Sequence, residues 1–248
     1  MYTTALIWLL LTPFLLSLVA FAMRWLGQAG TWLVEILHLI SVTVVLVLTV
    51  IVVQGVLAQG AVTAANDWFH VDALAAVFLL IIGVVGFLVG LYSIGYIRND
   101  LQVGELKEPQ VSLYYGLFEL FVFTMLLVVV ANNIIIMWVA VEATTLGSAF
   151  LVGIYGHRSS LEAAWKYVMI CTVGVAFGLY GTVLVYSDAI HFMQETGTAV
   201  LWTEIVKNAS SLDPTLLKMA FVFVLIGFGT KAGIFPMHAW LPDAHSEA

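Results

Sequence analysis

Charged side chains are scarce in this sequence of 248 residues, where 15 acidic and 8 basic residues make up only 9% of the chain. Soluble domains are typically about a quarter charged, so too few charges are present to cover a globular core with a water-facing shell. The five lysines and three arginines form no cluster, and we therefore expect no nucleic-acid partner. Cys171 is the only cysteine, which excludes an intrachain disulfide and a cysteine-based metal site.

Apolar residues replace the missing charge: they make up 62% of the chain and give a mean hydropathy of +1.08. A bilayer core about 30 Å thick needs roughly 20 apolar residues in a helix that rises ~1.5 Å per residue. Runs of this kind occur at residues 4–23, 32–57, 71–97, 112–131, 133–155, 161–186 and 216–241. We therefore predict an all-α, polytopic bundle of about seven transmembrane helices in a lipid bilayer.

Basic residues near the helix ends predict the orientation. The first run lacks a basic segment before it, so we expect a retained helix rather than a cleaved signal peptide. An outside N-terminus places four basic residues on the inner side and two on the outer side: Arg24, Arg98, Lys107 and Arg158 against Lys207 and Lys218. We predict a multi-pass protein of a bacterial or archaeal inner membrane with its N-terminus outside. Residues 98–111 and 187–215 are expected to be aqueous loops, the second with a short interfacial helix near 201–206.

Two ionisable residues lie deep in the apolar runs, where a charge costs several kcal/mol, from about 2.5 upward. Glu142 is near the centre of the fifth run, and its structural alternative is a carboxyl group bonded to Thr144 or Thr145. Lys231 lies in the seventh run, which we expect to be broken near Lys231 to Pro236 because proline lacks a backbone N–H. A broken helix exposes backbone groups that need a polar environment.

An acid and a lysine at mid-membrane suit reversible protonation. Their proton affinities depend strongly on burial and on the distance between them, so a change in that distance moves protons. We predict that Glu142 and Lys231 form such an intramembrane pair. Lys166 either relays protons toward Glu142 or extends to the surface, and His238 either extends the relay or bonds the backbone of the broken helix.

Three further polar residues have less distinctive positions. Glu119 lies about seven residues into the fourth run, where it is either functional or an outer-third acid that faces a polar neighbour. Glu35 and His38 are three residues apart on one helix face. Two ligands are weak evidence for a metal site, so we interpret these two residues as a polar interfacial face.

Four segments carry a family resemblance: VDALAAVF from Val71, WVAVEATTL from Trp138, EAAWKY from Glu162 and GTKAGIFPMHAWLPDAH from Gly229. They resemble the proton-translocating antiporter-like subunits of respiratory complex I, Mrp cation/proton antiporters and energy-converting hydrogenases. The second and third segments are most similar to the F subunit of hydrogenase-4 complexes. The resemblance implies that Glu142 and Lys231 are the proton-channel pair and that Lys166 and His238 match relay positions.

Members of that family are about twice as long and contain two inverted-topology units of five helices. The resemblance implies an N-terminal three-helix segment at 1–111 and the start of an antiporter-like unit at 112–248. That unit is expected to be incomplete at its C-terminus, with another polypeptide supplying the second half.

Three functions stay open. The first is a proton- or sodium-translocating subunit of a redox-driven complex, with other membrane subunits and peripheral Ni-Fe or iron–sulfur subunits as partners. Electron transfer would then occur on those subunits, and no cofactor or metal site is predicted in this chain. The second is an Mrp-like cation/proton antiporter component, and the third is a truncated scaffold that pumps nothing.

Overall fold

The computed structural model describes residues 1–25, 28–193 and 197–247. Within these ranges, seven helices are long and apolar enough to cross a membrane: α1 (Tyr2–Met23), α2 (Gln28–Gln59), α3 (Ala73–Val103), α4 (Glu108–Val130), α5 (Ile134–Val152), α6 (Arg158–Met193) and α8 (Pro214–Ala232). The short elements are β1 (Val62–Ala64), β2 (Phe69–Val71), α7 (Trp202–Lys207), the 3-10 helix η1 (Ala209–Ser211) and α9 (Trp240–Glu247). The prediction of a polytopic helical bundle is confirmed.

Several helix ends differ from the predicted ones. Helix α3 continues to Val103 and α6 to Met193, so residues 98–103 and 187–193 are helical rather than loop. Polar residues at the end of a spanning helix still satisfy their backbone groups inside that helix. Gly104 ends α3 in the left-handed conformation, with φ 88°. The predicted short helix near 201–206 is α7.

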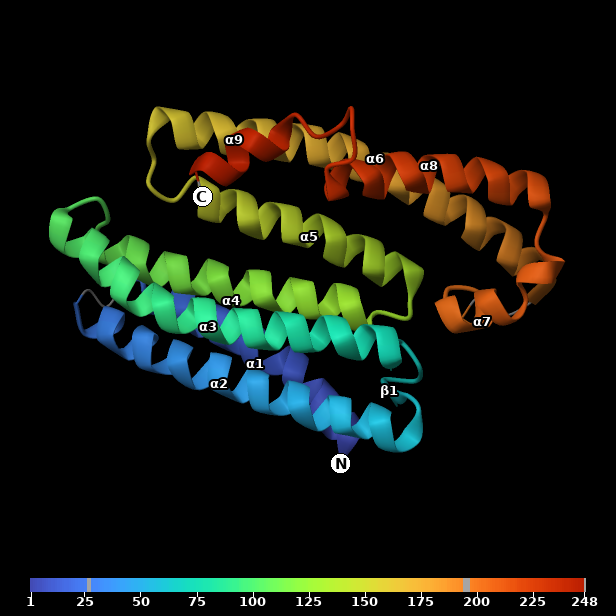
Figure 1. Cartoon of the computed structure of the whole chain (residues 1–248), viewed down its shortest axis with the longest axis horizontal. Helices are drawn as coiled ribbons and strands as arrows, with labels where there is room; N and C mark the ends of the chain where they lie inside the picture. The colour runs from blue at the N-terminus through green and yellow to red at the C-terminus, as the bar shows by residue number, and fades with distance from the viewer. Residues whose placement is uncertain (26–27, 194–196, 248) are drawn as a thin grey trace. The chain divides into compact units, whose positions relative to one another are not determined.

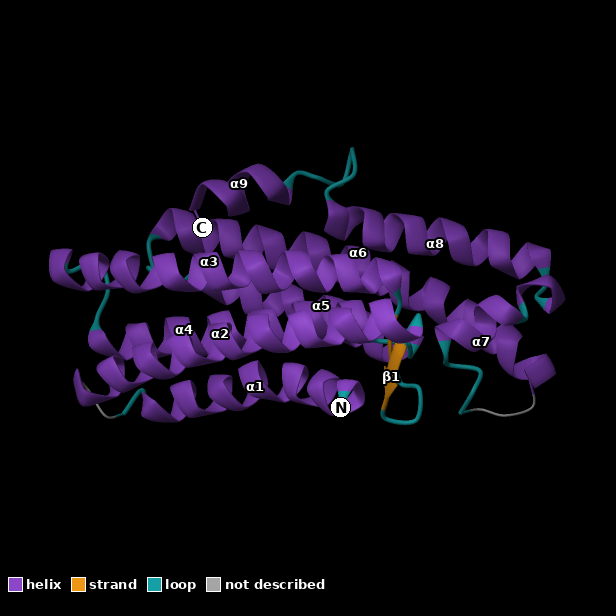
Figure 2. Cartoon of the chain, turned by 60° about the horizontal axis from the view of Figure 1, so that its bottom comes forward, coloured by secondary structure: helices purple, strands orange, loops and turns teal. Residues whose placement is uncertain are grey.

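The chain forms two compact units, and helices α1 to α4 belong to the first, which comprises residues 1–66, 70–130 and 154–156. Its four helices lie side by side (Figure 1), and Figure 2 shows β1 near the N-terminus of α1. Asp72 caps α3 by accepting a 2.8 Å hydrogen bond from the backbone N–H of Ala75. The domain boundary expected at residue 111 stays a prediction.

Apolar side chains cover the outer face of this unit as well as its core. Val34, Ile97 and Tyr115 are buried together, whereas Leu74 and Val77 on α3 are exposed. An exposed apolar face along a helix of this length fits hydrocarbon rather than water.

The second unit, residues 67–69, 131–153 and 157–248, contains α5 to α9. Helix α6 packs along both α5 and α8, and α9 lies against α6 (Figure 1). The contact between α6 and α8 is close because both helices carry glycine there. A Cβ atom on Gly227 would lie only 2.3 Å from the backbone nitrogen of Gly178. Small residues of this kind let two helix backbones approach in a membrane.

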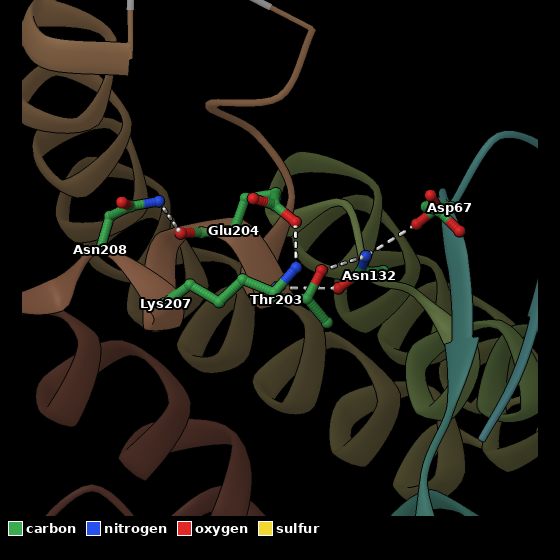
Figure 3. A network of polar contacts seen from close by, with 6 residues as sticks. All are labelled: Asp67, Asn132, Thr203, Glu204, Lys207 and Asn208. Carbon is green, nitrogen blue, oxygen red and sulfur yellow. Dashed lines mark hydrogen bonds and ion pairs between the residues drawn. The ribbon is translucent and has the colours of Figure 1, made fainter. Parts of the chain in front are cut away.

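A network of hydrogen bonds centred on Asn132 joins the connecting segments of this unit (Figure 3). The Asn132 amide donates to the Asp67 carbonyl over 2.7 Å and to the Thr203 hydroxyl over 3.0 Å, and its oxygen accepts from the Thr203 N–H over 3.1 Å. The next residue, Asn133, caps α5 by accepting from two backbone N–H groups. The start of α5 is therefore fixed by both asparagines.

The run predicted at 216–241 is split into two helices, as expected. Helix α8 ends at Ala232, and Gly233 follows in the left-handed conformation with φ 75°. The Ile234 N–H then donates to the Gly229 carbonyl over 2.9 Å, and the Trp240 indole N–H donates to the Thr230 carbonyl over 3.0 Å. These bonds satisfy carbonyl groups that the helix end leaves free.

We predict that Gly227→Ala destabilises the second unit by about 1–3 kcal/mol, because the new methyl group collides with backbone rather than with a flexible side chain. Gly229→Ala on the same helix is the matched control, since its Cβ would meet nothing nearer than Ile234 Cδ1 at 3.4 Å. Thermal unfolding midpoints in detergent measure both variants. Equal midpoints would contradict the assigned role of the Gly227 contact.

Candidate functional site

Lys231 is the next-to-last residue of α8, and neutral oxygens hold its ammonium group. Its Nζ donates to the Thr145 hydroxyl over 2.9 Å and to the Tyr167 hydroxyl over 2.6 Å. The same atom lies 4.8 Å from the centre of the Tyr167 ring, a distance suited to a cation–π contact. The negative end of the α8 dipole also favours a cation here. Among the described residues, Lys231 forms no ion pair.

Tyr167 extends these contacts into a chain of hydroxyl groups. Its hydroxyl lies 2.8 Å from the Ser148 hydroxyl, and Ser148 also lies 2.7 Å from the Thr144 carbonyl, to which it donates. Because Lys231 donates to Tyr167 and Ser148 uses its proton on the carbonyl, Tyr167 donates to Ser148. The order of donation is therefore Lys231, Tyr167, Ser148.

The Tyr167 ring is fixed by an aromatic partner from beyond the helix break. It stacks on Trp240, with ring centres 4.7 Å apart and an interplanar angle of 29°. Trp240 is held in turn by its bond to the Thr230 carbonyl. The break after α8 thus positions the tyrosine that binds Lys231.

Glu142 lies in the same unit with only one carboxyl oxygen bonded within the described ranges. Its Oε1 accepts a 2.7 Å hydrogen bond from the Thr172 hydroxyl of α6, while its Oε2 is buried without a partner there. The alternative partners considered from the sequence are wrong, because the Thr144 and Thr145 hydroxyls donate to the Val141 carbonyl instead.

Glu142 and Lys231 do not touch, although α5 and α6, which supply the two partners of Lys231, also carry Glu142 and its partner. Thr145, which binds Lys231, follows Glu142 by three residues and so lies about one turn further along α5. Ten residues separate Glu142 from the end of α5 at Val152, which places the carboxyl group roughly 15 Å inside the span. Both residues are half-buried, and both have hydroxyl groups as their partners.

Lys166 and His238 lie elsewhere in this unit. Lys166 Nζ is half-exposed and forms ion pairs with Glu162 and Asp243, each at 2.9 Å. His238 is exposed and its ring lies 5.5 Å from the Phe235 ring. No described contact joins either residue to Glu142 or Lys231, so their part in a relay stays a prediction.

Sequence reasoning missed the hydroxyl partners Ser148, Tyr167 and Thr172, and it considered Thr145 as a partner of Glu142 rather than of Lys231. Neutral hydroxyl side chains are common in membrane helices and carry no distinctive signal alone. The available signal was spacing: Thr145 is three residues after Glu142, and Ser148 is three after Thr145, so all three share one face of α5.

Known families match most of the chain beyond the first two helices. Residues 65–104 match the family described as NADH-ubiquinone oxidoreductase (complex I), chain 5 N-terminus. Residues 131–248 match the transmembrane family of NADH:quinone oxidoreductase and Mrp antiporters.

Individual relatives agree with these families. A hydrogenase-4 component F homolog of Methylacidiphilum infernorum is 42% identical over 182 residues, which cover 73% of this chain and 38% of the relative. A Na(+)/H(+) antiporter protein of Alkalihalophilus pseudofirmus is 31% identical over 97% of this chain and 29% of its own length. The chain thus spans well under half the length of these curated relatives.

Solved structures share the fold at lower identity. A chain of an archaeal membrane-bound sulfane sulfur reductase superposes with a TM-score of 0.80 and 20% identity, covering 98% of this chain and 48% of that one. A chain of the Mrp complex from Dietzia sp. gives 0.72 and 24%, covering 98% and 25%. Taken with the matched families and the hydrogenase-4 relative, the chain belongs to the antiporter-like membrane subunits found in complex I, Mrp antiporters and hydrogenase-4 complexes.

Proposed function

We propose that this chain translocates protons across the membrane as one subunit of a redox-driven complex and that Glu142 and Lys231 are its proton-carrying groups. The observation that supports this most is the Lys231 ammonium, which lies within an apolar bundle and, among the described residues, is bonded only to the hydroxyls of Thr145 and Tyr167. A half-buried cation without a counterion between apolar helices is expensive and contributes little to folding, which favours a functional role for it.

The hydroxyl chain supplies a way for the proton to leave. Lys231 passes a proton to the Tyr167 oxygen while Tyr167 passes its own proton to Ser148, and Ser148 releases its hydroxyl proton from the Thr144 carbonyl to a water molecule beyond this chain of hydroxyls. The reverse steps reload the amine. Proton number is conserved at each transfer, and Lys231 changes from charged to neutral. The unpartnered Oε2 of Glu142 is the proton-accepting atom on the neighbouring turn of α5. A small shift of α8 against α5 changes the proton affinities of both groups.

By the same proposal, we assign the partners, the membrane location and the domain organisation of this chain. Other membrane subunits surround the chain, and peripheral Ni-Fe or iron–sulfur subunits carry the electrons. This chain lies in an inner membrane with its N-terminus outside. Residues 1–111 act as an N-terminal segment and 112–248 as the start of the antiporter-like unit, with Lys166 and His238 leading protons toward its surface.

An Mrp-like cation/proton antiporter component is the second candidate. The relative from Alkalihalophilus pseudofirmus, which matches 97% of this chain, favours it. The proteins that co-purify with this chain distinguish the two functions: Ni-Fe or iron–sulfur proteins support the redox-driven complex, and small membrane subunits alone support the antiporter. A requirement for Na⁺ in transport assays identifies the ion.

We predict that Lys231→Ala and Glu142→Gln each abolish proton translocation while the complex still assembles, because each removes one proton-carrying group. Dye quenching in inside-out membrane vesicles measures translocation, and co-purification measures assembly. Lys218→Ala is the matched control on α8, since Lys218 is exposed near the start of that helix. Unchanged translocation in both site variants would support a non-pumping scaffold instead.

We predict that Tyr167→Phe slows translocation about ten- to hundredfold, since a hydrogen bond to a charged group contributes roughly 1.5–3 kcal/mol. The phenylalanine ring keeps the stack on Trp240, so assembly should be retained. Tyr180→Phe on the same helix is the control, because the Tyr180 ring is half-exposed and packs on Phe223. Equal rates in both variants would remove Tyr167 from the pathway.

A further inference from the structure

A second buried acid lies at the centre of the first unit. Helix α4 runs from Glu108 to Val130, so Glu119 is eleven residues from either end. Glu119 therefore lies at the middle of its helix rather than about seven residues from its start, because the helix begins four residues before the predicted run. Glu119 and His38 are both 0% exposed, and the prediction of an interfacial position for His38 is wrong.

Glu119 is bonded through both carboxyl oxygens to α2. Its Oε1 lies 2.7 Å from His38 Nδ1, and its Oε2 accepts a 2.8 Å hydrogen bond from the Ser41 hydroxyl. The other ring nitrogen of His38, Nε2, is buried without a partner in the part of the chain that the structure describes. The Tyr115 ring lies 4.7 Å from the His38 ring, and the Tyr115 hydroxyl likewise has no partner among those residues. Two unpartnered polar atoms thus accompany one buried carboxyl group.

Gly90 of α3 packs closely against the unpartnered nitrogen. A Cβ atom on Gly90 would lie 3.1 Å from His38 Nε2, so any larger residue would crowd this atom. A buried polar atom without a partner costs free energy, which makes Nε2 the candidate proton-accepting atom of His38.

Polar groups continue from His38 toward the membrane surface. Glu35 precedes His38 by one turn of α2 and binds Arg98 of α3 through bonds of 2.9 Å and 2.6 Å. The Arg98 side chain is 54% exposed, whereas that of Glu35 is 8% exposed. A line of polar side chains therefore leads from a half-exposed arginine to Glu119.

The charged groups around Glu119 do not compensate a negative charge on its carboxyl group. Glu35 and Arg98 neutralise each other, α1 has no acidic or basic residue from Tyr2 to Met23, and Asp100 of α3 accepts a bond from Tyr155. An ionised Glu119 beside a neutral His38 carries one net negative charge in an apolar interior. One added proton cancels that charge and its desolvation cost.

We propose that Glu119 and His38 form a second proton-binding site, separate from Glu142 and Lys231, that exchanges one proton with the membrane surface by way of the Glu35 carboxylate, which Arg98 holds in place. The arriving proton binds His38 Nε2 while the Nδ1 proton moves to Glu119 Oε1, so the pair gains one proton in total. Release follows the reverse order. Ser41 holds the other carboxyl oxygen throughout and fixes the acid against the imidazole.

Infrared difference spectroscopy between about pH 5 and about pH 9 tests this site. The full chain is purified with its accompanying membrane subunits and placed in lipid nanodiscs. We expect a pH-dependent carboxylic-acid C=O band that disappears in Glu119→Gln and remains in Glu142→Gln. The second variant keeps this result independent of the proposed function. A Glu119→Gln spectrum identical to that of the unaltered protein would overturn the proposal.

A pair of glycine variants tests the route while keeping both titrating groups. Gly90→Ala places a methyl group 3.1 Å from His38 Nε2 and 2.9 Å from Val42 Cγ1, whereas a methyl group on Gly86, one turn away, meets nothing within 4 Å. We expect Gly90→Ala to shift the midpoint of the band by about one pH unit and Gly86→Ala to leave it in place. Equal midpoints would overturn proton entry through Nε2.

Discussion

The hydrogen bonds of the Lys231 ammonium determine much of the second unit. Its two hydroxyl partners come from different helices, Thr145 on α5 and Tyr167 on α6, so α8 has to end where both can reach it. Close packing through Gly178 and Gly227 brings α8 near α6. The break after Ala232 returns the chain so that Trp240 stacks on Tyr167. The end of α8, its packing against α6 and the break after Ala232 therefore all contribute to the position of one hydrogen-bonded cation.

The features that depend on hydrophobicity and backbone chemistry could be predicted from the sequence. Seven apolar runs identified the spanning helices because a bilayer imposes a minimum length of roughly 20 residues. Pro236 identified the break after α8 because proline does not continue a helix well. Glu142 and Lys231 were found because charge is rare at such depth. In each case the residue type alone is sufficient for the prediction, and its neighbours in space need not be known.

The partners of those residues could not be predicted in the same way. Tyr167 and Thr172 are ordinary residues on an apolar helix until α5 and α8 are placed beside them. The position of Glu119 was misjudged for a local reason: Glu108 and Pro109 were assigned to a loop, although proline is favourable in the first turn of a helix. His38 was judged from its own helix alone, whereas its carboxyl partner lies 81 residues further along the chain.

In both units, the ion pairs lie nearer the surface than the ionisable groups that have no partner of opposite charge. Arg98 with Glu35, and Lys166 with its two acids, include half-exposed side chains, and such ion pairs add little to stability. The other three ionisable groups, by contrast, have no carboxylate, ammonium or guanidinium partner: hydroxyls bind Lys231 and Glu142, and an imidazole and a hydroxyl bind Glu119. A buried pair of opposite charges would keep its net charge at zero and resist protonation changes. A buried group with neutral partners changes the net charge of its surroundings with every proton, and only such a group couples proton binding to helix movement through electrostatic energy.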